Sequence, residues 1–152
     1  MKDFCIIGSG ISGATIANAL SKKYSLDVYD KARGVGGRSS NKKLNKNESF
    51  DHGVQYISPK SIQFKKFIKN LIAKKVVKKW AGKHLFLNTD KKEDKKHIKI
   101  IGKKGNNAIS KYLLKKIDCS FNNEVIKIFN KNKVWEIYFS DGSKKLYKSL
   151  IL

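Results

Sequence analysis

Glycines gather in one short segment near the start of the chain, Gly8-Ser9-Gly10-Ile11-Ser12-Gly13. The segment joins an apolar run, residues 3–7, to residues 12–22, which have helical periodicity. Glycines at a strand-to-helix junction allow a tight turn and let the backbone come close to a bound group. The helix N-terminus then presents amide donors and a positive dipole to phosphate groups. These residues therefore predict a pyrophosphate-binding loop.

A single acid, Asp30, ends the second apolar run, residues 26–30. It lies about twenty residues beyond the glycine loop, where a carboxylate can accept hydrogen bonds from ribose hydroxyls. Its negative charge disfavours a 2′-phosphate. Loop and acid together predict a dinucleotide-binding unit, while a glycine turn that only packs a strand on a helix stays open as the alternative.

Both arginines of the chain flank a second group of glycines, in Arg33-Gly34-Val35-Gly36-Gly37-Arg38, although lysine is spread over the whole sequence. The planar guanidinium can bind phosphate through two parallel hydrogen bonds, and a lysine ammonium cannot. Arginine is thus retained where its geometry matters.

Two segments carry a resemblance to a known family. Asp30-Lys31 followed by Gly36-Gly37-Arg38 resembles the flavin amine-oxidase superfamily, and Phe50-Asp51-His52-Gly53-Val54-Gln55-Tyr56 resembles its renalase-like branch. The resemblance implies FAD as the cofactor, with Arg38 on phosphate and residues 53–55 beside the isoalloxazine ring. An ordinary buried strand is the alternative interpretation of residues 50–56. The expected cofactor-binding residues are Gly8, Ser9, Gly10, Ile11, Ser12, Gly13, Asp30, Lys31, Gly37, Arg38, Gly53, Val54, Gln55 and Val125.

The same resemblance implies an oxidoreductase in which the flavin takes a hydride from a reduced substrate and is reoxidised by dioxygen. A reduced nicotinamide dinucleotide is the favoured small-molecule substrate, and an amine is the second choice. No catalytic side chain is nominated, because the cofactor supplies the chemistry. Three other classes stay open: a nucleotide-binding module without turnover, a truncated non-catalytic fragment, and a basic nucleic-acid-binding protein.

The remaining sequence alternates between strand and helix patterns, which predicts an α/β fold of Rossmann type. Ser58-Pro59 is expected to start a helix whose apolar stripe includes Ile68 and Leu71. Further elements are expected at residues 84–87, 97–101, 109–117, 124–129, 134–139 and 145–152, with a charged turn at 90–96 and a hairpin turn at 141–142.

Residues 1–58 and 105–152 are assigned to a discontinuous FAD-binding domain, and 59–104 to the beginning of an inserted mixed α/β substrate domain. Because members of the family are commonly about twice as long, the resemblance implies a truncated chain whose missing half a second chain could supply. The last strand, residues 145–152, is then expected to have an unpaired, apolar edge.

The net charge of +22 comes mainly from lysines scattered along the sequence, which argues against a specific nucleic-acid surface. No apolar run reaches the roughly 20 residues that cross a bilayer, so a cytoplasmic protein without a membrane partner is expected. Cys5 and Cys119 show no C-x-x-C spacing, and the three histidines lack ligand spacing, so no metal is expected.

Overall fold

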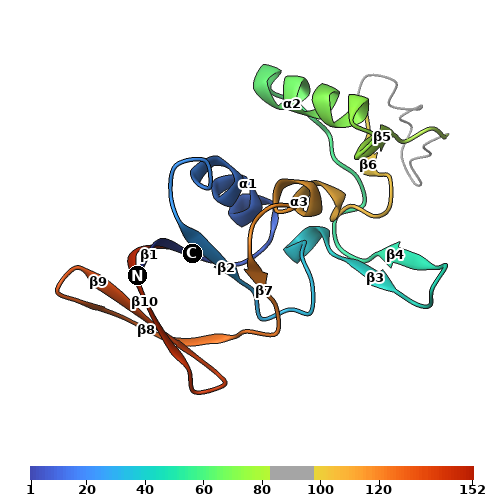
Figure 1. Ribbon diagram of the computed structural model, residues 1–152. Coiled ribbons are helices and arrows are strands. Elements are labelled where there is room, and N and C mark those ends of the chain that lie inside the picture. Colours follow the sequence, from blue (N-terminus) through green and yellow to red (C-terminus); the bar gives the residue numbers. More distant parts are fainter. Residues whose placement is uncertain (83–97) are drawn as a thin grey trace, which may run out of the picture.

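The computed structural model describes residues 1–82 and 98–152 (Figure 1). A six-stranded sheet forms the centre, in the order β7-β2-β1-β10-β9-β8. The expected strand at 84–87, the charged turn at 90–96, and two of the histidines, His84 and His97, lie outside the described residues. The sheet strands are β1 (Lys2–Ile7), β2 (Leu26–Tyr29), β7 (Cys119–Ser120), β8 (Val125–Lys131), β9 (Val134–Phe139) and β10 (Lys144–Ile151).

Strand order reverses at β1. This strand pairs in parallel with β2 on one side and with β10 on the other, and β7 extends the parallel part beyond β2. Strands β9 and β8 continue the sheet as an antiparallel meander. In open α/β sheets, ligands bind outside the carboxyl ends of the strands at such a reversal. The predicted α/β, Rossmann-type fold is confirmed.

The last strand is not an unpaired edge, so that expectation was wrong. β10 lies between β1 and β9, with Ile6 opposite Ile151 on one side and Lys144 opposite Tyr138 on the other. The turn at 141–142 reverses the chain after β9 and thereby brings β10 back beside β1. The edges of this sheet are β7 and β8.

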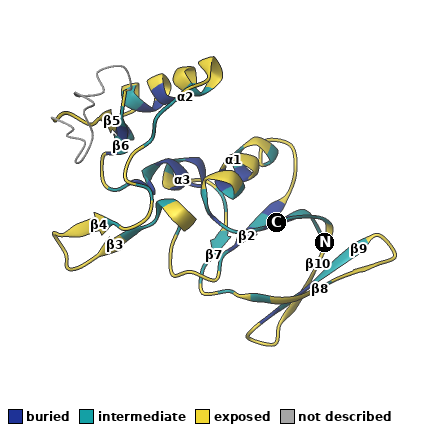
Figure 2. Ribbon diagram, turned by 180° about the vertical axis from the view of Figure 1, so that it is seen from behind, coloured by how far each residue is buried: buried dark blue, intermediate teal, exposed yellow. Residues whose placement is uncertain are grey.

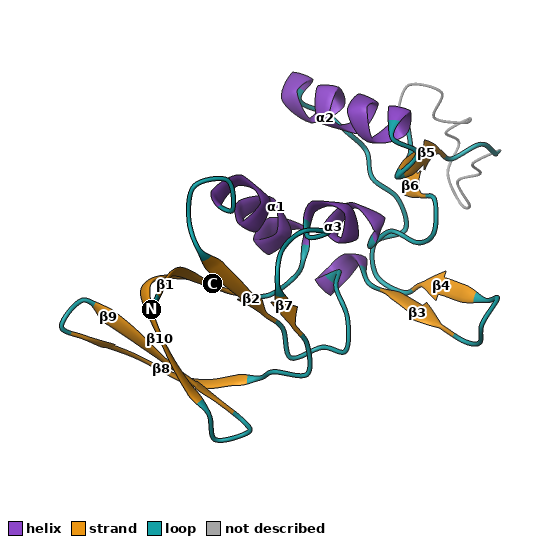
Figure 3. Ribbon diagram, viewed as in Figure 1, coloured by secondary structure: helices purple, strands orange, loops and turns teal. Residues whose placement is uncertain are grey.

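Helices α1 (Ile11–Leu20) and α3 (Ala108–Leu113) pack side by side against the sheet (Figure 3). The small side chains of Ala14 and Ala17 are completely buried, which lets α1 approach the strands closely. Asn18 links the two helices, because its side-chain amide donates to the carbonyl of Leu113 at 2.9 Å. Ile16, also on α1, is 37% exposed.

Helix α2 (Ile62–Ala73) begins later than the sequence indicates. Its N-cap is Ser61, whose hydroxyl accepts a hydrogen bond from the Phe64 amide at 3.2 Å, so a start at Ser58-Pro59 was wrong. Its apolar stripe is confirmed, since Ile68 and Leu71 are buried (Figure 2). Two short antiparallel strand pairs lie outside the central sheet: β3 (Asn41–Lys43) with β4 (Ser49–Asp51), and β5 (Val77–Lys79) with β6 (Ile100–Gly102).

Two apolar clusters hold these elements together. The larger contains residues of β1, β2, α1 and α3 and continues into α2, β5 and β6. The smaller surrounds Cys5 and Tyr29 on the meander side. Burial raises the pKa of the Cys5 thiol to about 12, which makes it a poor nucleophile at neutral pH. Among the described residues, no helix has the length and apolar character needed to cross a bilayer.

Candidate dinucleotide-binding site

A cavity of about 540 Å³ opens at the carboxyl ends of β1 and β10, where the strand order reverses. Three chain segments that are distant in sequence contribute to its wall: the glycine loop, the glycine–arginine segment and the segment after β4. Its lining consists of Ile6, Ile7, Gly8, Gly10, Ile11, Ser12, Gly13, Ile16, Gly36, Gly37, Arg38, Ser39, Val54, Ile151 and Leu152.

The glycine loop packs tightly against the start of α1. A Cβ added to Gly13 would lie 2.0 Å from the carbonyl oxygen of Gly8, so no larger residue fits without moving the backbone. Gly8 itself has a φ of +104°, and the space beside it is open. The helix that follows has neither a side-chain cap nor an acidic residue in its first turn. Its first amide groups therefore suit an external anion.

The glycine–arginine segment lies directly on this loop. The Gly36 amide donates to the carbonyl of Ser9 at 3.2 Å, and a Cβ on Gly37 would lie 3.3 Å from the Cα of Gly10. The short helix η1 (Gly37–Ser39) then turns Arg38 into the wall of the cavity. Among the described residues, Arg38 is the one with a charged side chain in that wall, and no Asp or Glu lines it. A negatively charged ligand is therefore favoured.

The segment after β4 is fixed to Arg38 through the backbone. The Val54 amide donates to the Arg38 carbonyl at 2.9 Å, and a Cβ on Gly53 would lie 2.1 Å from that oxygen. Gly37, Arg38, His52, Gly53 and Val54 also line an adjoining hollow of about 380 Å³. The two spaces share residues 37, 38 and 54, so they form one continuous wall.

A buried asparagine, Asn106, holds this arrangement in place. Its side-chain amide donates to the carbonyls of Val54 at 2.7 Å and Gln55 at 3.0 Å, while its side-chain oxygen accepts from the Gly102 amide at 2.8 Å. The sequence analysis did not assign this role. The available signal was an asparagine immediately before a helix and after a glycine, a pattern that also fits a simple cap.

Asp30 anchors the glycine loop. One carboxylate oxygen accepts from the Ser9 amide at 2.8 Å and from its hydroxyl at 2.5 Å, and the other accepts from the Ala32 amide at 2.9 Å. Next to Asp30, the Asn123 amide donates to the Asp30 carbonyl at 3.1 Å. Asn123 lies two residues before Val125, where β8 begins. The chain that leads into β8 is therefore hydrogen-bonded to residue 30.

The expected site residues thus divide into two groups. Gly8, Gly10, Ile11, Ser12, Gly13, Gly37, Arg38 and Val54 meet at the main cavity, with Gly53 in the adjoining hollow. Ser9, Asp30, Lys31, Gln55 and Val125 lie outside both linings. The sequence analysis missed Ile6, Ile7, Ile16, Gly36, Ser39, Ile151 and Leu152.

Strand pairing brings several of the missed residues to the cavity. Ile7 and Ile151 end neighbouring parallel strands, so their place could be known only once β10 was paired with β1. His52, the one described histidine, approaches the hydroxyl of Ser40 through Nε2 at 3.0 Å. No cluster of His, Cys, Asp or Glu suited to a metal occurs in the parts of the chain that the structure describes.

Comparison with known proteins supports this architecture. The profile of the NAD(P)-binding Rossmann-like domain family matches residues 6–71. Putrescine oxidase, in a structure with bound putrescine, is 14% identical, with a TM-score of 0.71 over 99% of this chain and 57% of that one. The tetracycline destructase Tet(51) is 18% identical, with a TM-score of 0.62 over 99% of this chain and 38% of its own.

A candidate FAD-containing monooxygenase from Photorhabdus luminescens subsp. laumondii TTO1 gives a similar result, with 19% identity, a TM-score of 0.62, and coverage of 99% and 38% of the two chains. The domain is a Rossmann-type dinucleotide-binding fold like that of these enzymes. The chain spans little more than half the length of putrescine oxidase and about two fifths of the other two.

Proposed function

We propose that this chain binds FAD and forms the cofactor-binding part of an FAD-dependent oxidoreductase of the renalase-like branch. One observation carries the proposal: residues 8–13, 36–38 and 53–54, which are distant in sequence, meet at a single cavity where the strand order reverses. A glycine turn that merely packs a helix would not require the second segment to be bonded to it and the third segment to be bonded to the second.

The residues present fit a flavin dinucleotide. The open space beside Gly8 and the uncapped start of α1 would receive the pyrophosphate, and the Arg38 guanidinium would pair with a phosphate oxygen. Asp30 would contact the ribose while keeping its bonds to Ser9, because an ionised carboxylate can accept about four hydrogen bonds. Val125 would meet the adenine.

Residues 53–55 would lie beside the isoalloxazine ring, where the absence of a side chain at Gly53 permits close backbone approach. FAD, when bound, would accept a hydride from a reduced nicotinamide dinucleotide or an amine and pass electrons to dioxygen. This chain's own contribution is to hold and orient the cofactor. We assign no described side chain as a catalytic acid or base.

We further propose that residues 1–58 and 105–152 form the cofactor domain and that 59–104 begin a substrate domain. The separate β5–β6 hairpin with α2 supports this division (Figure 1). The larger apolar cluster continues from β1 into β5 and β6, so the two parts share one core.

Additional polypeptide is proposed to cover the cavity. Ile11 is 43% exposed and Ile16 is 37% exposed at its rim. Such apolar groups are suited to contact another protein segment. A second chain is one source of that segment.

The test is to purify the full chain with added FAD and to record flavin absorbance and light scattering across a gel-filtration peak. We expect FAD to co-elute with a monodisperse species and to be reduced when a dihydronicotinamide or an amine is added without oxygen. Co-elution without reduction by either class would favour a binding module without turnover. Protein that stays colourless at saturating FAD would contradict the proposal.

A further inference from the structure

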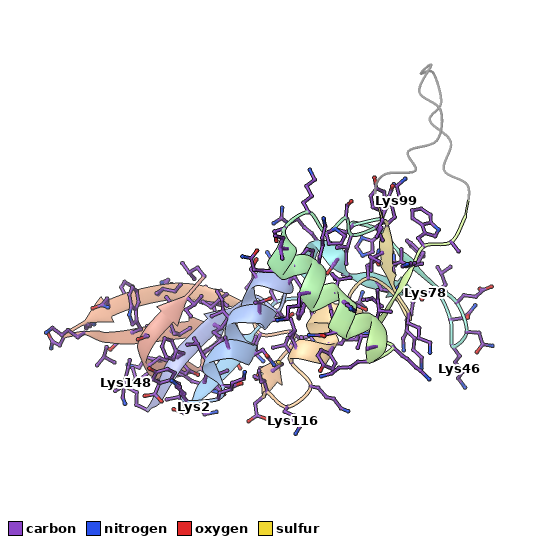
Figure 4. All side chains as sticks on the ribbon, turned by 90° about the horizontal axis from the view of Figure 1, so that it is seen from above. Lys2, Lys46, Lys78, Lys99, Lys116 and Lys148 are labelled. Atoms are coloured by element: carbon purple, nitrogen blue, oxygen red, sulfur yellow. The ribbon has the colours of Figure 1, made fainter. Side chains whose placement is uncertain are left out.

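Charge is distributed unevenly between the two parts of the fold. Residues 52–82 and 98–117, which include α2, β5, β6 and α3, contain fourteen lysines and no Asp or Glu. Residues 1–51 and 118–152 contain fifteen basic and nine acidic residues. Lysine also occurs outside this part, as Lys2, Lys46 and Lys148 show (Figure 4). The absence of carboxylates, rather than the presence of lysine, distinguishes the first part.

Five of these lysines surround one hollow of about 430 Å³ between the end of α2 and α3: Lys75, Lys103, Lys104, Lys111 and Lys115. We call it the lysine hollow. None of the five forms an ion pair with a residue that the structure describes. Like charges brought together without a counterion repel one another, so the free protein gains from any anion that enters.

The backbone at Lys75 adds an independent observation. This residue has a φ of +57°, in the left-handed region, directly after the helix cap Lys74. Glycine usually occupies that position at a helix end, and other residues incur a steric cost there. Lys75 lines the hollow in spite of that cost. Local strain retained in this way is typical of functional sites.

The shape and chemistry of the hollow select a class of ligand. Val76 and Ala108 contribute an apolar floor, and the volume is that of a small-molecule pocket. Lysine ammonium groups bind phosphate as point charges. The Tyr112 hydroxyl accepts a hydrogen bond from Lys74 at 2.6 Å, and the same ammonium group lies 5.2 Å from the centroid of the Tyr112 ring. Lys74 therefore covers part of the ring face on which a nucleobase would stack.

We propose that the lysine hollow binds a compact anion carrying two or more phosphate groups, at a site separate from the dinucleotide cavity. Several linked phosphates can neutralise several lysines at once, which a single phosphate cannot do. The proposal does not depend on FAD binding, because none of the five lysines lines the dinucleotide cavity.

Inorganic triphosphate is the probe, titrated calorimetrically into the full chain already saturated with FAD. The triple variant Lys103→Gln/Lys104→Gln/Lys111→Gln should weaken binding at least tenfold. The matched control, Lys22→Gln/Lys127→Gln/Lys131→Gln, removes the same charge from exposed positions elsewhere and should weaken it less than threefold. Raised salt should weaken wild-type binding. Equal losses in both triple variants, or no saturable binding by the wild type, would overturn the proposal.

The variant Lys75→Gly distinguishes a loss of triphosphate binding from a loss of folding stability. It should lower triphosphate affinity about threefold or more while leaving the thermal unfolding midpoint unchanged or higher, because glycine relieves the left-handed strain. Unchanged affinity would count against the site. A single-stranded oligonucleotide serves as the second ligand: if it binds and triphosphate does not, the surface recognises nucleic acid and the compact-anion proposal is wrong.

Discussion

Gly53 shows most directly how a single side chain would disturb the candidate site. Gly53→Ala places a methyl group against the Arg38 carbonyl oxygen, at a distance no real contact allows. The backbone of residue 38 or 53 must therefore move, and we expect FAD affinity to fall at least tenfold together with a loss of about 1 to 3 kcal/mol in the free energy of unfolding. Fluorescence titration with FAD and urea unfolding would measure both.

Gly34→Ala is the matched control, because an added Cβ there meets no atom within 4 Å. It should leave FAD affinity unchanged. Equal effects of the two substitutions would show that residue 53 has no special approach to Arg38.

Arg38 allows the charge of a side chain to be separated from its shape. Arg38→Lys keeps the positive charge in the cavity wall but removes the planar fork, so FAD retention on gel filtration should fall. We expect a loss of roughly tenfold in affinity, the scale of one charge-assisted hydrogen bond. Lys22→Arg, a change at an exposed position outside the cavity lining, is the control. If Arg38→Lys retained FAD as well as wild type does, bidentate phosphate binding would be contradicted.

At the scale of elements, the start of α2 distinguishes two serines that look alike in sequence. Ser61 caps the Phe64 amide, whereas Ser58 lies three residues upstream of that cap. Ser61→Ala should therefore cost about 1 kcal/mol in the free energy of unfolding, and Ser58→Ala only a few tenths. Urea unfolding curves of the two variants would check this, and a larger loss for Ser58→Ala would place the cap where Pro59 suggested.

Long, strongly patterned elements were predictable from sequence. β1, β2, β9, β10 and the stripe of α2 were identified because each has enough apolar residues to define a period. β3, β4 and β5 have three residues each and are rich in lysine or polar groups, so no local pattern marks them. Pairing of β10 with β1 depends on contacts more than a hundred residues apart in sequence.

The candidate site was predictable to the same extent. Residues 8–13 and Arg38 have distinctive types and spacing, and they do meet. Asn106 was missed as the residue that fixes 54–55, because its partners lie about fifty positions away. Motifs indicate which segments form a site, but only the fold shows which residue holds them together.

Considered as a whole, the molecule is tied across β1 by a chain of polar contacts. Lys145 donates to the Tyr29 hydroxyl at 2.9 Å, and the Tyr29 and Tyr147 hydroxyls lie 2.7 Å apart. Tyr147 donates to Asp27 at 2.8 Å, and Lys2 donates to the other oxygen of Asp27 at 2.6 Å. Because the Tyr147 hydroxyl donates its hydrogen bond to Asp27, the Tyr29 hydroxyl must be the donor to Tyr147. The network joins β2 to β10 on either side of β1.

Because it contains a carboxylate, this network makes the free energy of unfolding depend on pH. Burial pushes the pKa of Asp27 upward, but hydrogen bonds from Lys2 and Tyr147 outweigh it, and the net shift is downward. A depressed pKa contributes stability above the unfolded value of about 4, and this contribution is lost as the pH falls through the folded value. Asp27→Asn should cost about 1 to 3 kcal/mol at pH 7, and the difference from wild type should shrink below pH 4.

Urea unfolding at pH 7, 5 and 3 would measure that difference. Glu124→Gln is the control, since this exposed carboxylate lies 4.0 Å from Lys31 and should contribute less than about 0.5 kcal/mol at each pH. If the difference in the free energy of unfolding between Asp27→Asn and wild type stayed constant from pH 7 to 3, the charge of the Asp27 carboxylate would not be what stabilises the network.

The pairing of β1 with β10 also has a consequence for synthesis on the ribosome. The first strand leaves the exit tunnel well before residues 144–151, which form one of its two neighbours, have been made. Until then, the apolar flank of β1 stands open and the dinucleotide cavity lacks Ile151 and Leu152 from its wall. Nascent chains should therefore gain affinity for the cofactor only after β10 has been made, and the apolar flank exposed until then is the kind of surface that chaperones shield.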